Sequence, residues 1–203
     1  MVFKTANPSF KRDLTQTLGS TNSRVRTQPF ILQLQRRTAQ AAIGASSLRN
    51  QGAPGVISVA RDELAELNLL AFSRGTRVSF HQLLNRSTDK LLKRFPPKAQ
   101  SWGAARKALN LFLRDAVYNQ DLSHFYGLSE IRGWLEVPLD KDVGTKLCAE
   151  PEGKNLPKWI QIKTLQLPVS AQFQSVASAV ATRKRMHRVD LDIYYWRPKD
   201  AEA

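Results

Sequence analysis

Lys107 and Asp140 are the two residues whose types and placement best suit covalent chemistry in this 203-residue chain. Lys107 falls at the start of a predicted apolar helix, and Asp140 follows Val137-Pro-Leu139 at the predicted start of another. An unprotonated amine attacks electrophilic carbon, and a nearby carboxylate stabilises the cation that forms. Each residue also has an ordinary role available, as a solvated first-turn lysine and as a helix N-cap.

The helix after Gly103 carries the strongest periodic pattern in the chain. Its apolar positions recur at helical spacing and form one stripe that faces a core, as follows: Ala105, Leu109, Phe112, Leu113, Ala116 and Val117. The helix that begins at Asp140 places Val143 and Leu147 inward. We therefore expect two helical starts to present the amine and the carboxylate.

The remaining pattern is also helical, so we expect a mainly α fold. Further helices are predicted over Phe30–Ile43, after Gly55, from a Ser79 cap to Phe95, and from a Ser170 cap to Arg185. Residues 189–196 alternate like a strand, but a lone strand would leave its backbone groups unpaired, which favours a helix there. We divide the chain into a basic, partly flexible arm at 1–46 and one helical domain at 47–203.

The balance of charge points to a polyanionic partner. The chain has 31 Lys and Arg against 17 Asp and Glu, a formal net charge of +14. This favours nucleic acid ahead of an anionic membrane as the partner, although a generally basic surface would give the same count. No apolar run of about 18 residues is present, so we expect no membrane span.

Cysteine and histidine usage limits the other possibilities. Cys148 is the only cysteine and the three histidines are scattered, so we predict no disulfide, metal site or cofactor. A reducing intracellular location is expected, cytoplasmic or nucleoid-associated. The Arg-, Ser- and Thr-rich first 46 residues leave organellar import open. We expect a monomer.

The two helical starts resemble the conserved segments of the helix-hairpin-helix DNA glycosylases. Residues 103–113 are similar to the hairpin and second helix of that superfamily, and residues 138–143 to its aspartate segment. The spacing between them and the closing residues 191–196 resemble the archaeal 8-oxoguanine glycosylase branch. The resemblance covers about residues 47–197. It departs at the turn, where Ala105 replaces the second glycine and Ser101-Trp102 replaces Leu-Pro.

The resemblance implies an enzyme that binds double-stranded DNA, removes a base and cleaves the strand at the abasic site. Lys107 would attack C1′ of the deoxyribose, and Asp140 would stabilise the positive charge or relay a proton. Residues expected to bind DNA are Trp102, Gly103, Ala105, Arg106 and Lys141. Candidates for the base pocket or for the wedge that fills the vacated site are Asn50, Gln51 and Trp134.

Two other functions remain open from the sequence. A non-catalytic nucleic-acid-binding protein would keep the helices and the basic surface without a pocket. A basic component of a ribonucleoprotein would use residues 1–46 as its main contact. The base that the enzyme would excise, an oxidised purine or a modified base of foreign DNA, is also open.

Overall fold

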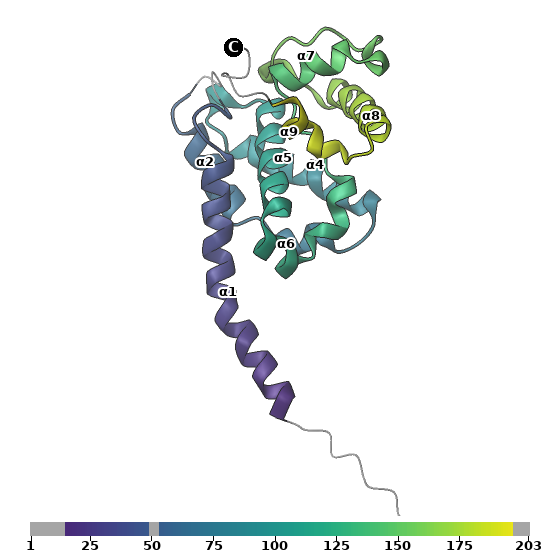
Figure 1. Cartoon of the computed structure of the whole chain (residues 1–203). Helices are drawn as coiled ribbons and strands as arrows, with labels where there is room; N and C mark the ends of the chain where they lie inside the picture. The colour runs from purple at the N-terminus through teal and green to yellow at the C-terminus, as the bar shows by residue number, and fades with distance from the viewer. Residues whose placement is uncertain (1–14, 49–52, 197–203) are drawn as a thin grey trace, which may run out of the picture.

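Helices make up the fold (Figure 1). The computed structural model describes residues 15–48 and 53–196, with side chains from residue 28 onward, and these residues contain no strand. The α-helices are α1 (Thr15–Ala42), α2 (Val56–Ala65), α3 (Leu69–Ser73), α4 (Arg77–Arg94), α5 (Trp102–Tyr118), α6 (Gln120–Tyr126), α7 (Lys141–Ala149), α8 (Leu167–Arg183) and α9 (Leu191–Tyr195). Short 3-10 helices are η1 (Pro97–Ala99), η2 (Leu128–Trp134), η3 (Pro151–Gly153), η4 (Ile162–Thr164) and η5 (Arg188–Asp190).

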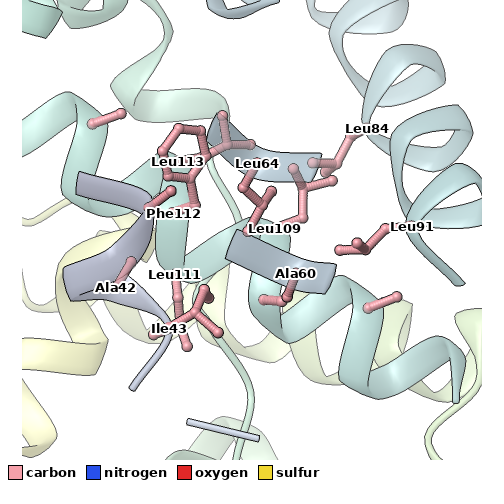
Figure 2. Close-up of a cluster of buried hydrophobic side chains, with 14 of the residues drawn as sticks. Ala42, Ile43, Ala60, Leu64, Leu84, Leu91, Leu109, Leu111, Phe112 and Leu113 are labelled. Carbon is pink, nitrogen blue, oxygen red and sulfur yellow. The ribbon is translucent and has the colours of Figure 1, made fainter. Parts of the chain in front are cut away.

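Helix α5 is the central element and is buried along most of its length. Leu109 and Phe112 lie inside a core to which α1, α2 and α4 contribute, and Figure 2 shows them among Ala60, Leu64 and other apolar side chains. The predicted apolar stripe is therefore confirmed. Truncating a fully buried phenylalanine such as Phe112 to alanine costs about 3–5 kcal/mol.

A second, smaller core joins α7, α8 and α9. Phe173 of α8 packs with Val143 and Leu147 of α7 and with Tyr195 of α9, and Trp102 at the start of α5 completes this cluster. Figure 1 shows α7 and α8 together at one end of the molecule. Lys107 thus belongs to the helix that contributes to both cores, and Asp140 to the segment that enters the smaller one.

The expected boundary at residue 46 is wrong, because α1 is part of the main core. Ile31, Ala39 and Ile43 are buried, and the buried amide of Gln35 donates hydrogen bonds to the carbonyls of Ala65 and Leu67 at 3.0 and 2.8 Å. The predicted helix over Phe30–Ile43 exists, but it is the end of a longer helix with Pro29 inside it. The apolar face of this helix packs on the core, while the basic residues whose side chains the structure describes lie on the other face.

Helix boundaries follow the predicted caps in part. Asp140 caps α7 as expected, and residues 189–196 form η5 and α9 rather than a strand. Helix α4 begins one turn earlier than predicted, because Thr76 is its N-cap and Ser79 completes a capping box. Helix α8 begins at Leu167, three residues before the predicted Ser170 cap. No helix in residues 15–48 and 53–196 is long and apolar enough to cross a bilayer.

Candidate functional site

The structure brings Lys107 and Asp140 together. Lys107 lies in the second turn of α5, and its Nζ is 3.3 Å from Oδ2 of Asp140. The other carboxylate oxygen, Oδ1, accepts a hydrogen bond of 3.0 Å from the Val143 backbone N–H at the start of α7. Capping and pairing with the amine are therefore made at the same time, one by each oxygen of Asp140.

This pair forms part of the wall of a cleft of about 650 Å³. This volume lies within the range of about 300–1,000 Å³ that is usual for pockets that bind small molecules. The Lys107 side chain is 11% exposed and that of Asp140 32%, so the amine is largely withdrawn from solvent while the carboxylate faces the opening. Leu111 and Trp196 add apolar surface to the same cleft.

A second ion pair lines the same cleft. Arg114 of α5 binds Asp192 of α9, and Arg114 also contacts its neighbour Asp115 at 2.7 Å. Burial raises the pKa of the Asp192 carboxyl above its ordinary value, against the attraction of Arg114. These contacts fix α9 to α5 and hold Trp196 at the edge of the cleft.

The structure contradicts the prediction that Arg106 contacts DNA. Arg106 is 3% exposed and points into the protein, where its guanidinium lies 3.0 Å from Oε2 of Glu136. It also donates hydrogen bonds to Thr88 Oγ1 at 2.8 Å and Asn85 Oδ1 at 2.6 Å. Burial lowers the pKa of Arg106, and Glu136 opposes that shift. Its position one residue before Lys107 turns it by about 100° around the helix axis, away from the cleft.

Trp102, Gly103 and Ala105 are also placed differently from the prediction. No turn forms at Gly103, which lies inside the first turn of α5, and all three residues are buried. A Cβ on Gly103 would lie 2.1 Å from the Ile162 carbonyl oxygen, so the glycine permits η4 to pack on the helix start. The start of α5 is covered and capped by Ser101, and it is not open to a phosphate.

The remaining predicted residues divide three ways. Lys141 is exposed and lines the cleft next to Asp140, as a DNA contact requires. Trp134 lies elsewhere: it is partly buried, packs against the main core edge-on to Phe80 at 5.9 Å, and does not line this cleft, which contradicts its prediction as a pocket residue. Asn50 and Gln51 lie outside the described residues.

The prediction missed the residues that form the outer cleft. Trp159, Ile160, Gln161 and Lys163 line it from the segment between α7 and α8, and Trp196 lines it from the end of α9. The available signal was Lys158-Trp-Ile-Gln-Ile-Lys163, in which two lysines flank a mostly apolar stretch next to a loop that contains Pro and Gly. That pattern has no helical periodicity, so only the fold places it beside Lys107.

Another hollow of similar size, about 590 Å³, lies between α1 and α2. Charges of both signs line it, and Arg36 and Glu66 pair within it at 2.9 Å. No lysine is among the residues that line it, so it does not repeat the arrangement of Lys107 and Asp140. We found no family model, curated protein or solved structure that matches this chain.

Proposed function

We propose that the protein is a DNA glycosylase that uses Lys107 as its nucleophile and Asp140 as its proton carrier. The observation that carries the proposal is the 3.3 Å contact between Lys107 Nζ and Asp140 Oδ2 in the wall of a cleft of about 650 Å³. An excess of 14 positive charges supplies attraction to the phosphate backbone. The resemblance of residues 103–113 and 138–143 to helix-hairpin-helix glycosylases adds to this argument.

The reaction begins when an extruded nucleotide enters the cleft with C1′ facing Lys107. The ammonium gives one proton to Asp140, and the nitrogen lone pair forms a bond to C1′. The bond from C1′ to the base breaks, and its electron pair leaves with the base, which takes the proton from Asp140. The carboxylate thereby returns to its charged form beside the cationic adduct.

A Schiff base then forms from this adduct. Asp140 removes the second amine proton, and the nitrogen lone pair moves into a double bond to C1′ as the C1′–O4′ bond opens. The O4′ oxygen takes the proton back from Asp140 and becomes a hydroxyl. The Schiff base acidifies the C2′ hydrogens. Asp140, again a carboxylate, takes one of these protons, the freed electron pair forms a C2′–C3′ double bond, and the 3′ phosphate leaves with the electrons of the C3′–O bond, which cuts the strand.

The apolar part of the cleft suits a planar base. Trp196 is 70% exposed at the cleft, and Leu111 lies one helical turn from Lys107 on α5. Stacking of a base on an aromatic side chain is worth about 1–3 kcal/mol. The base would therefore sit between apolar side chains while its sugar faces the amine.

The deciding experiment is borohydride trapping on DNA that carries a preformed abasic site. Reduction of the Schiff base would link the wild-type protein covalently to the DNA. Lys107→Gln should abolish the link, whereas Lys98→Gln, an exposed lysine on η1, should leave it unchanged. Trapping that persists in Lys107→Gln would overturn the assignment. Duplexes with different damaged or modified bases would then identify the base removed.

A non-catalytic binder is the competing function. It would show salt-dependent affinity for DNA in the same assay without any covalent product. Tighter binding to structured RNA than to duplex DNA, again without a covalent product, would indicate a ribonucleoprotein component. Both results would leave the contact of Lys107 with Asp140 as a structural ion pair.

A further inference from the structure

The loop of residues 158–163, here named the cleft loop, places an apolar side chain in solvent at the rim of the cleft. Ile160 is 76% exposed, and its neighbour Gln161 is also exposed. Both line the cleft that contains Lys107 and Asp140. Single exposed apolar residues are common on protein surfaces. The anchoring of this loop and its flanking lysines distinguish Ile160 from such residues.

The cleft loop is anchored on both sides of Ile160. The Trp159 ring packs edge-on against Phe173 of α8 at 5.3 Å and lies so close to Gly144 of α7 that a Cβ there would be 2.4 Å from it. Gly103 gives the same close approach to Ile162 on the other side. Two glycines thus allow the loop to lie against two helices. These contacts on either side hold Ile160 and Gln161 in place at the rim of the cleft.

Two lysines lie on either side of the exposed pair. Lys158 and Lys163 are exposed, and neither makes an ion pair with another residue that the structure describes. Lysines flanking an apolar tip match a duplex, where phosphates border the stacked bases. A protein partner would need a larger apolar patch at this point.

We infer that Ile160 and Gln161 form the wedge that enters the DNA duplex when a nucleotide is extruded into the cleft. This inference rests on the proposed function. Apolar side chains that insert between base steps support a kinked, unstacked duplex. Ile160 would replace the lost stacking, and the Gln161 amide would hydrogen-bond the unpaired base. The rigid anchoring prepares the pair before DNA binds, so the wedge role belongs here and not to Trp134.

The test compares duplex and single-stranded DNA, because only the duplex needs a wedge. The double variant Ile160→Ala, Gln161→Ala should lose about tenfold in trapping rate on an abasic duplex and keep the wild-type rate on the same single strand. Ile160→Leu should keep both rates, since it preserves the apolar volume. Val78→Ala, which shortens an apolar side chain that is 67% exposed on α4, is the matched control.

A fluorescence measurement separates this inference from the proposed chemistry. A 2-aminopurine placed beside an abasic analogue should brighten when the wild-type protein unstacks it, and the double variant should not produce this change. If the fluorescence rises but no protein is trapped, the wedge stands and the glycosylase proposal fails. The wedge would be overturned if the double variant were trapped on duplex as fast as the wild type, or lost rate equally on duplex and single strand. It would also be overturned if the double variant still brightened the probe, or if the wild-type protein did not brighten it.

Discussion

Arg106 and Lys107 are neighbours on α5, and each pairs with a carboxylate from the segment between η2 and α7, yet their surroundings differ sharply. The side chains of Arg106 and Glu136 are 4% and 9% exposed, whereas those of Lys107 and Asp140 are 11% and 32% exposed. The first pair is enclosed by Thr88 and other hydrogen-bonding groups, while the second faces a cleft.

This contrast separates stability from chemistry on a single helix. A buried guanidinium with three polar partners cannot be reached by a substrate, and its removal leaves the buried Glu136 side chain without its cation. An amine at a cleft wall can be reached, and its partner Asp140 keeps one oxygen for the helix cap. Substitutions in the two pairs and beside the cleft test this contrast.

The largest effect is expected for Lys107→Arg. A guanidinium keeps the charge and reaches Asp140, but it cannot act as the nucleophile at C1′. Covalent trapping on abasic DNA should disappear, while DNA affinity and the free energy of unfolding stay near the wild-type values. Gel analysis after borohydride reduction, with chemical denaturation in parallel, measures both. A trapped Lys107→Arg protein would show that another amine reacts.

Asp140→Asn should come next. Asparagine caps a helix about as well as aspartate, so α7 should hold, but the amide cannot accept the proton from Lys107. The single-turnover rate should fall about 10²- to 10⁴-fold, with a change in unfolding free energy below about 1 kcal/mol. Asp142→Asn, two residues further along the same cleft, serves as the control. Equal losses in the two variants would contradict a specific role for Asp140.

Arg106→Ala should affect stability instead. Removing one partner of the buried pair costs about 3–5 kcal/mol, measurable by urea denaturation. The double variant Arg106→Met, Glu136→Leu should recover part of this loss, because it leaves no buried charge unpaired. A small loss in the single variant would mean that water reaches Glu136. In that case the two pairs on α5 would be alike after all.

Lys141→Gln should weaken DNA binding by removing one phosphate contact. The slope of log affinity against log salt concentration should shrink by about 0.9 for duplex DNA. Lys93→Gln on α4, also exposed but outside the cleft, should leave the slope unchanged. Affinity titrations across a range of salt concentrations provide the measurement. An unchanged slope for Lys141→Gln would remove Lys141 from the interface.

The smallest effect is expected for Glu150, which forms a third ion pair with the more exposed Arg183. Partial burial would raise the pKa of Glu150, but hydrogen bonds from Tyr195 at 2.8 Å and from Arg183 outweigh it and hold that pKa below its ordinary value. Its stabilising contribution is therefore present above about pH 4.5 and is lost as the pH falls through the lowered pKa. Between pH 5 and 3 the free energy of unfolding of Glu150→Gln should therefore change less with pH than that of the wild type, by less than about 1 kcal/mol.

Part of the candidate site could be predicted from the sequence. Periodicity located α5, and the proline and aspartate before Val143 located the cap of α7, because both signals are local. Arg106 shows the limit of this reasoning. Its charge suggested DNA, but helix rotation carries it toward Glu136 and away from the cleft. Trp102 and Trp134 were equally ambiguous, since a tryptophan serves a core and a stacking surface alike.

Local patterns were enough to predict the mainly helical character, the stripe along α5 and the cap at Asp140, since each depends on residues within a few turns of one another. The burial of particular cations, the place of α1 in the core and the loop that borders Lys107 became clear from the three-dimensional structure alone. Those outcomes depend on contacts between residues tens of positions apart, such as Gly103 with Ile162, and local pattern does not encode them.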